Sequence, residues 1–279
     1  MTGERSQAYR AFYAALVAGG RDPRIQEAFA VVPRESFAGR GPWLLKGIGR
    51  DYVKTPNDDP AFLYQDALLA LDAERGINIG QPSAHAMWLD AVKLQPGERV
   101  LQVGVGSGYY TAILAHLVGV EGRVFAYEID QELAQRAGTN LDHRPQIELR
   151  AESAIQEGLP KVDAVYVCTG ITQPSWTWID ALKPGGRLLF PLQPPGGVGG
   201  MLLVERPEHG TAWPARFVSR AAFIDCLGPQ DEDAGKRLAE AFRGSWEQVR
   251  SFRIDDARDA TQWHYGEGWW LSSAPAEAN

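Results

Sequence analysis

The stretch Val100–Tyr110, with the sequence VLQVGVGSGYY, decides the fold. Its first four residues have the apolar pattern of a short strand, and helical spacing begins at Tyr110. Between them lie Gly104, Gly106 and Gly108, whose alternation lets the backbone turn sharply and lets a ligand approach it closely. Strand, glycine-rich turn and helix together predict the first unit of a nucleotide-binding α/β sheet.

The segments that follow repeat this order of short apolar runs and helical stretches. Helical spacing recurs over 110–117 and 131–141, and the strand-like runs are 100–103, 123–128, 147–150, 162–168 and 187–192. The alternation predicts a doubly wound, Rossmann-like α/β sheet that is mostly parallel. Residues 201–206 and 216–226 follow one another with no room for a helix, so we expect an antiparallel strand at the end of the sheet.

The remaining sequence suggests three segments. Residues 1–75 predict helices over 4–20 and from Pro23, followed by an irregular stretch over 39–60 that is rich in Gly, Pro and Asp. The sheet domain is expected over 76–226, with a helix over 82–92. Residues 227–279 form a Trp-rich C-terminal extension, whose aromatic side chains either pack in a core or form a platform for a peptide or ring-bearing substrate.

Composition excludes several classes of protein. The 279 residues carry 28 Lys and Arg against 35 Asp and Glu, a formal net charge of −7, which argues against a partner that is a nucleic acid. Two cysteines and five histidines do not predict a zinc cluster or a disulfide framework, so no metal is expected. The charged N-terminus lacks the apolar run of a secretory signal, and no stretch is long enough to span a membrane. We therefore expect a cytoplasmic protein.

Two acidic residues follow strands of the predicted sheet and favour an adenosine-type ligand. Glu128 ends the strand after the glycine turn and can accept hydrogen bonds from ribose hydroxyls. Glu152 follows the third strand and can accept one from an adenine amino group. The glycines are spaced G-x-G-x-G and followed by Tyr109 and Tyr110, which would crowd a pyrophosphate and favour S-adenosylmethionine. A glycine turn that binds no nucleotide is the alternative.

Six stretches in the same order resemble the protein-L-isoaspartate O-methyltransferase family, over about residues 8–205. They are IQEAFAVVPRESF (25–37), YQD (64–66), GINIGQPSAHA (76–86), VKLQPGERVLQVGVGSGYY (92–110), AESAIQEGLPKVDAVYV (151–167) and LKPGGRLLFPL (182–192). The resemblance implies a methyltransferase sheet, S-adenosylmethionine as the cofactor, and a protein or peptide carboxylate as the acceptor.

The resemblance also implies two groups of site residues. Those expected to bind the cofactor are Ile79, Val103, Gly104, Gly106, Ser107, Gly108, Glu128, Ile129, Glu152 and Ser153. Those of a loop expected to position the acceptor are Gly80, Gln81, Ser83 and His85. Gly80 departs from the family, which has a small hydroxyl residue, typically serine, at this position. Ser83 and His85 are candidates to compensate for the missing hydroxyl.

The expected chemistry asks little of the side chains. A carboxylate is already ionised at neutral pH, so its methylation needs positioning and exclusion of water rather than a general base. The alternatives are a methyltransferase acting on a peptide natural product or small molecule, a catalytically silent cofactor-binding protein, and a nicotinamide oxidoreductase. A nucleic-acid methyltransferase is disfavoured because residues 168–171 read CTGI, without the Pro-Pro-aromatic pattern that holds a base.

Overall fold

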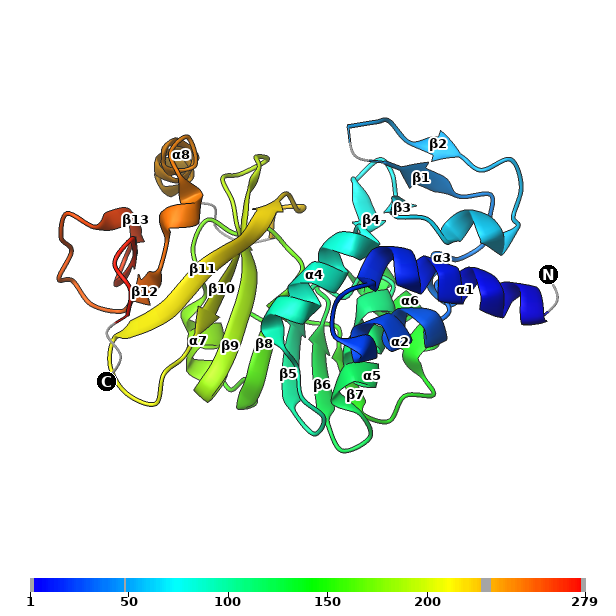
Figure 1. Ribbon diagram of the computed structural model, residues 1–279, viewed down its shortest axis with the longest axis horizontal. Coiled ribbons are helices and arrows are strands. Elements are labelled where there is room, and N and C mark those ends of the chain that lie inside the picture. The colour runs from blue at the N-terminus through cyan, green and yellow to red at the C-terminus, as the bar shows by residue number, and fades with distance from the viewer. Residues whose placement is uncertain (1–2, 48, 227–231, 277–279) are drawn as a thin grey trace. The chain divides into compact units, whose positions relative to one another are not determined.

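The computed structural model describes residues 3–47, 49–226 and 232–276, and Figure 1 shows its ribbon. The chain forms two compact units. The first comprises Met1–Glu98 and Gly104–Ser153, and the second comprises Arg99–Val103 and Ala154–Asn279. The predicted division at 75/76 and 226/227 concerns segments of sequence and stays a prediction. Residue 227, where its third segment begins, lies outside the described residues.

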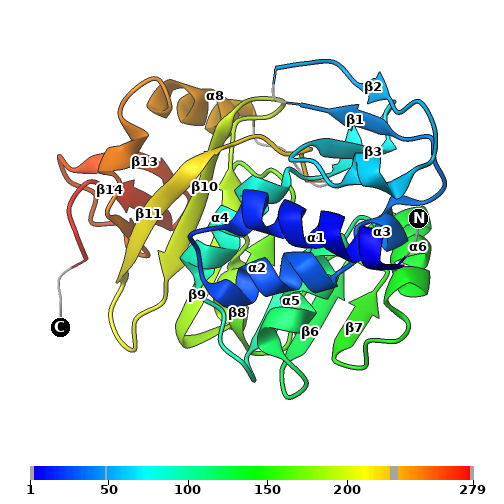
Figure 2. The same ribbon diagram turned by 45° about the vertical axis from the view of Figure 1, so that its right-hand side comes forward.

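The helices of the first unit include the expected N-terminal pair. They are α1 (Gly3–Ala18), α2 (Pro23–Val31), α3 (Glu35–Ala38), α4 (Pro82–Val92), α5 (Tyr109–Val118), α6 (Gln131–Leu141) and the 3₁₀ helix η1 (Pro60–Leu63). Asp22 caps α2 by accepting a hydrogen bond from the amide of Arg24, with Pro23 at the first helical position. Helices α1 and α2 lie side by side (Figure 2) and bury Tyr13 and Phe29 between neighbouring elements.

The strands of the first unit belong to two groups. A small antiparallel sheet has the order β2-β1-β3-β4, with β1 (Leu44–Lys46), β2 (Val53–Lys54), β3 (Leu68–Asp72) and β4 (Ile77–Ile79). The other two strands, β6 (Arg123–Tyr127) and β7 (Ile147–Arg150), pair in parallel. The irregular stretch expected over 39–60 is thus partly wrong, since it contains β1 and β2. Two or three residues are too short to show a strand periodicity.

The second unit is dominated by strands in the order β13-β14-β12-β11-β10-β9-β8-β5. The strands are β5 (Arg99–Val103), β8 (Val162–Val167), β9 (Leu182–Leu192), β10 (Gly199–Glu205), β11 (Ala212–Ala221), β12 (Ser251–Arg253), β13 (Gln262–Gly266) and β14 (Trp269–Ser272). The helices are α7 (Trp176–Ala181), α8 (Glu232–Ala241) and the 3₁₀ helix η2 (Trp246–Gln248). Strands β5, β8 and β9 pair in parallel, and every later pairing is antiparallel.

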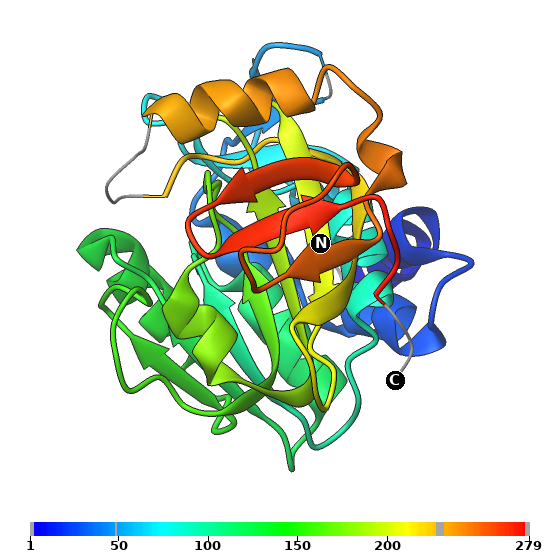
Figure 3. The same ribbon diagram turned by 90° about the vertical axis from the view of Figure 1, so that its left-hand side faces the viewer.

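The expected fold class is confirmed, with parallel core strands, antiparallel C-terminal strands and N-terminal helices. The antiparallel part extends further than one strand, because the C-terminal extension adds β12, β14 and β13 beyond β11 (Figure 3). Trp269 and Trp270 of the extension are buried, as is Trp213 in β11, whereas Trp246 and Trp263 are partly exposed. No helix within the described ranges has both the length and the apolar run needed to cross a bilayer.

Candidate functional site

The glycine turn forms a tight backbone loop between β5 and α5. Gly104, Gly106 and Gly108 have φ angles of 79°, 58° and 92°. Residues that carry a Cβ atom adopt such positive φ angles only under strain. A Cβ atom on Gly106 would lie 3.4 Å from Leu71 Cδ1, and one on Gly108 would lie 2.9 Å from Leu141 Cδ1. Glycine at these two positions therefore serves both the turn and its close packing.

Glu128 holds this loop from the end of β6. Its Oε2 atom accepts hydrogen bonds from the amides of Val105 (2.9 Å) and Gly106 (2.8 Å). Its Oε1 atom accepts one from the amide of Asp130 (3.1 Å), and the residue is only 7% exposed. A carboxylate offers about four acceptor positions, so Oε1 retains capacity for one more donor. The carboxylate thus fixes the loop and can still receive a ligand hydroxyl.

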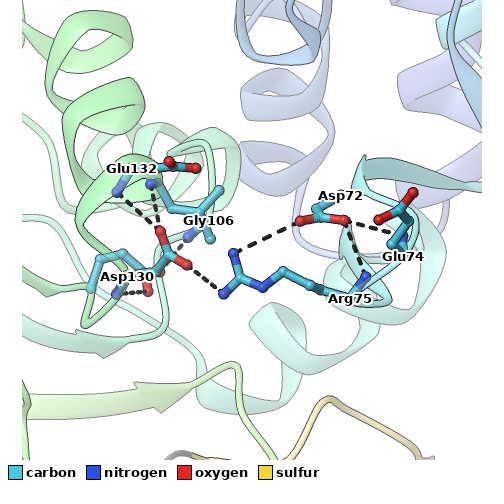
Figure 4. Close-up of polar contacts among 8 residues, drawn as sticks. Asp72, Glu74, Arg75, Gly106, Asp130 and Glu132 are labelled. Carbon is cyan, nitrogen blue, oxygen red and sulfur yellow. Dashed lines mark hydrogen bonds and ion pairs between the residues drawn. The ribbon is translucent and has the colours of Figure 1, made fainter.

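Asp130 connects this region to the hairpin of β3 and β4 (Figure 4). Its Oδ1 atom caps α6 by accepting hydrogen bonds from the amides of Glu132 and Leu133, both at 3.0 Å. Its Oδ2 atom lies 2.5 Å from Nη2 of Arg75, which stands at the tip of the hairpin. The hydrogen bond from Leu133 and the one from Arg75 hold the pKa of the Asp130 carboxyl below its usual range. Asp130 is therefore an ionised link between Arg75 and the segment that follows Glu128.

The other predicted cofactor residues lie in varied surroundings. Ile129 is 44% exposed, beside the buried Glu128. Glu152 is exposed and lies 3.5 Å from Arg150, while Ser153 is partly exposed. Ser107 is buried, and its carbonyl accepts a hydrogen bond from Asn140 Nδ2 (2.8 Å). Val103 ends β5 in the second unit, where its carbonyl accepts a hydrogen bond from Cys168.

The predicted acceptor loop runs from Ile79, at the end of β4, into α4. Asp66 holds it, through hydrogen bonds from the Ser83 amide (2.8 Å), the Ser83 hydroxyl (2.7 Å) and Gln81 Nε2 (2.9 Å). Gln81 occupies the N-cap position of α4 but makes no capping hydrogen bond through its side chain. Asp66, which is distant in sequence, thus provides the carboxylate that binds the first turn of α4, where no side chain of the N-cap residue does so.

Tyr110 joins this loop to the helix that follows the glycine turn. Its hydroxyl donates a 2.6 Å hydrogen bond to the carbonyl of Gly80. Its ring stacks on His85, with the ring centroids 3.4 Å apart and the planes 9° apart. His85 is 2% exposed, and burial, aided by the positive charge of Arg34, lowers the pKa of its imidazole to about 3. His85 is therefore neutral at physiological pH.

Arg34 supports the segment that carries Asp66. The side chain is fully buried, and its Nη atoms donate hydrogen bonds to the carbonyls of Leu63 (2.7 Å), Gln65 (2.8 Å) and Ala67 (2.7 Å). These three carbonyls flank Asp66 in sequence. The guanidinium also lies over the rings of Tyr13 and Tyr109. A buried cation thus shapes the chain just before β3.

The structure brings Ile79, Gly80, Gln81, Ser83 and His85 together in one loop and helix start. It also reveals three residues that the motif reasoning gave no site role, namely Arg34, Asp66 and Tyr110. In the sequence, the short YQD stretch is the signal for Asp66, and Tyr110 stands out by its bulk after the glycines. No set of three or more His, Cys, Asp or Glu side chains in the described part of the chain is arranged to hold a metal ion.

Comparison with known proteins identifies relatives over most of the chain. The family model "Protein-L-isoaspartate(D-aspartate) O-methyltransferase (PCMT)" matches residues 11–224. A protein-L-isoaspartate O-methyltransferase from Aeropyrum pernix is 33% identical over 211 residues, which are 74% of this chain and 73% of that protein. One from Thermotoga maritima is 30% identical over 62% of this chain, and the match spans about half (51%) of that longer protein.

Solved structures agree in fold. A protein-L-isoaspartate O-methyltransferase superposes with a TM-score of 0.65 at 22% identity, covering 84% of this chain and 69% of that one. A Plasmodium falciparum protein described as a beta-aspartate methyltransferase, solved with S-adenosyl-L-homocysteine, gives 0.60 at 18% identity and covers 79% and 97%. The expected resemblance is therefore confirmed, and this chain belongs to the protein-L-isoaspartate O-methyltransferase family of S-adenosylmethionine-dependent methyltransferases.

Proposed function

We propose that this protein transfers the methyl group of S-adenosylmethionine to the carboxylate of an isoaspartyl residue in a protein or peptide. One observation carries the proposal beyond membership of the family. The hydrogen bond from Tyr110 to the Gly80 carbonyl ties the acceptor loop to the helix that begins at the glycine turn. This contact supports a shared site for the acceptor loop and the glycine turn, as a reaction between two bound molecules requires.

The glycine turn and the acids after it fit the cofactor. Three glycines with positive φ angles make up the turn, so it offers bare backbone to a ligand. In our assignment, Gly104, Gly106 and Gly108 lie along the methionine part, with Ile79, Val103 and Ser107 as further lining residues. Glu128 accepts a ribose hydroxyl at Oε1, which has one backbone donor already. The adenine lies against the exposed Ile129, near Glu152 and Ser153.

The acceptor loop positions the carboxylate. When bound, S-adenosylmethionine supplies an electrophilic methyl group. An isoaspartyl carboxylate has a pKa of about 4, so it is ionised at pH 7. No residue has to remove a proton. Gly80, Gln81, Ser83 and His85 are proposed to hold the carboxylate and to exclude water, and Asp66 and Tyr110 keep that loop in place. The cytoplasmic location and the absence of a nucleic-acid partner stay predictions of the sequence.

The test separates the cofactor from the acceptor. S-Adenosylhomocysteine at about 100 times its Kd should stabilise the protein by about 2.7 kcal/mol, and NAD should not raise its Tm. Radiolabelled methyl transfer is then measured on an isoaspartyl hexapeptide and on its aspartyl twin, and we expect labelling of the first only. A Tm rise with S-adenosylhomocysteine but no labelling would reject the isoaspartyl acceptor and favour another acceptor or a silent cofactor-binding protein. A rise with NAD alone would reject the cofactor as well.

A further inference from the structure

Helix α1 exposes an apolar stripe along one side. Phe12 is 66% exposed and Leu16 is 64% exposed, although both side chains are large and apolar. The exposed residues around them on the same side are all small, namely Ala8, Ala11, Ala15 and Gly19, which follows the helix. Residues 11–20 include no charged residue, whereas the solvent side of a helix is normally charged or polar. The stripe therefore has the composition of a surface that another molecule covers.

The opposite side of α1 provides the packing within the first unit. Its buried residues are Tyr13, Ala14, Val17 and Ala18. The ring of Tyr13 packs edge-on against Phe29 of α2, with the ring centroids 6.1 Å apart. Helix α1 thus has two apolar sides, and the described chain buries one of them. A helix that is apolar on both sides is typical of one that packs against neighbours on both.

The spacing of the exposed stripe indicates what kind of neighbour fits it. Exposed residues recur at intervals of three and four, which is the seam of a helix that pairs with another helix; they are Arg5, Ala8, Phe12, Ala15 and Gly19. The small side chains of Ala8 and Ala15 let a second helix approach closely on either side of Phe12. The stripe therefore fits a helix whose large side chains lie where this one has small residues.

A second copy of α1 meets this condition when the two helices run antiparallel. The numbers of facing residues then add up to a constant. A sum of 27 places Phe12 opposite the partner's Ala15, and Ala8 opposite the partner's Gly19. Because a two-fold axis repeats each contact, both phenylalanine rings face a small residue, and Leu16 flanks the seam in each copy.

Charge also favours the antiparallel arrangement. A parallel pair would place the exposed guanidinium groups of the two Arg5 residues side by side. In the antiparallel pair with a sum of 27, each Arg5 lies opposite the partner's Asp22, at the carboxyl end of the partner's helix. The helix dipole makes that end partly negative. The carboxylate of Asp22, which also binds Arg24 of its own chain, is partly exposed there. Both features attract a guanidinium group.

We propose that α1 pairs with α1 of a second copy of this protein, antiparallel and about a two-fold axis, through the exposed apolar stripe. The contact extends along the 16 residues of α1, or about 24 Å, and buries less than the roughly 1,200 Å² of a standard interface. The dimer is therefore weak, with a Kd of about 10–100 µM. It does not depend on which acceptor is methylated.

Sedimentation velocity of the full chain between about 1 and about 500 µM tests the pairing, and the wild type should change from monomer to dimer across this range. Phe12→Glu places a carboxylate on the apolar seam of both copies, so the Kd should rise at least about tenfold. Val120→Glu changes a side chain that is 82% exposed outside α1, so this control should dimerise like the wild type. Both variants should keep the Tm within about 2 °C, since they alter exposed side chains.

Ala15→Leu separates a defined helix pair from general apolar association. Leucine favours a helix almost as much as alanine does, but it would fill the place of the partner's Phe12, so the Kd should rise about tenfold. Association without a defined register would instead become tighter, because the variant exposes more apolar surface. Arg5→Glu should weaken the dimer about threefold at low salt and have no effect in about 1 M salt.

Three results would overturn the proposal. The first is a wild type that stays monomeric at about 500 µM. The second is a dimer that Phe12→Glu leaves intact, which would mean that the two copies meet at another surface. The third is an Ala15→Leu variant that associates more tightly than the wild type.

Discussion

The glycine turn and the acceptor loop are built in opposite ways. Backbone groups make the glycine turn, with amides of residues 105 and 106 bound to one buried carboxylate, Glu128. Side chains hold the acceptor loop, namely Asp66 and Tyr110 from distant parts of the sequence and His85 from the first half of α4. The difference implies that the cofactor half, which is the glycine turn with Glu128, and the acceptor half, which is the acceptor loop with Asp66, can be perturbed separately.

The substitution with the largest expected effect removes the buried side chain that supports the acceptor half. Arg34→Met leaves the carbonyls of Leu63, Gln65 and Ala67 buried without their donors. We expect the free energy of unfolding to fall by about 3 kcal/mol, because each abandoned buried acceptor costs about 1–3 kcal/mol before relaxation. Urea unfolding measures it, with the exposed Arg40→Met as the control, which should change by less than about 0.5 kcal/mol. Equal losses in the two variants would contradict the role of Arg34.

A smaller effect should separate the two halves. Asp66→Asn weakens the hydrogen bonds to Gln81 and Ser83, so kcat/KM on the isoaspartyl peptide should fall about tenfold. The Kd for S-adenosylhomocysteine should stay within about twofold, since within the described residues the Asp66 side chain accepts its hydrogen bonds from the acceptor loop. Asp51→Asn, an exposed acid in the same unit, serves as the control. A parallel loss of cofactor affinity would show that the halves are not separable.

Acid should weaken the acceptor half through His85. The pKa of its imidazole is about 3 in the folded protein, against about 6.5 in the unfolded chain. The unfolded state thus binds more protons between these values, and the stability from the neutral ring is lost as pH falls below about 6.5. At pH 5 the expected loss in the free energy of unfolding is about 2 kcal/mol. His85→Phe should abolish this loss. His143→Phe, which replaces an exposed histidine, should not. Unfolding curves at pH 7 and pH 5 give the difference, and equal pH sensitivity of wild type and His85→Phe would refute it.

The smallest effect concerns Arg75, which joins the β3–β4 hairpin to Asp130 (Figure 4). The Arg75 side chain is 51% exposed, so water and salt screen the ion pair and its contribution is small. Arg75→Gln should weaken S-adenosylhomocysteine binding less than about fivefold, and the difference should vanish in about 1 M salt. Glu74→Gln, on the same hairpin tip, is the control. A loss of the same size at high salt would show that Arg75 acts by packing and not by charge.

The same difference explains what the sequence could predict. The strand, glycine turn and helix of residues 100–118 could be predicted because their signals are local, and α4 and α6 were predicted over 82–92 and 131–141 as observed. The roles of Asp66 and Arg34 could not, since the hydrogen bonds of Asp66 reach residues 15 and 17 positions away and those of Arg34 about 30. Nor could the sequence show that His85 fills the place beside Gly80. The position of the His85 ring follows from its packing in three dimensions, which the spacing of residues along the sequence does not predict.

Calorimetric titration of S-adenosylhomocysteine into wild type, Glu128→Gln and Asp66→Asn tests the separation of the two halves most directly. Glu128→Gln keeps an oxygen for the loop amides but removes the charge that should bind a ribose hydroxyl. A charge-assisted hydrogen bond is worth about 1.5–3 kcal/mol, so its Kd should rise about tenfold to hundredfold. Asp66→Asn should keep the wild-type Kd. Equal affinities in all three proteins, or a loss in Asp66→Asn as large as in Glu128→Gln, would contradict the account.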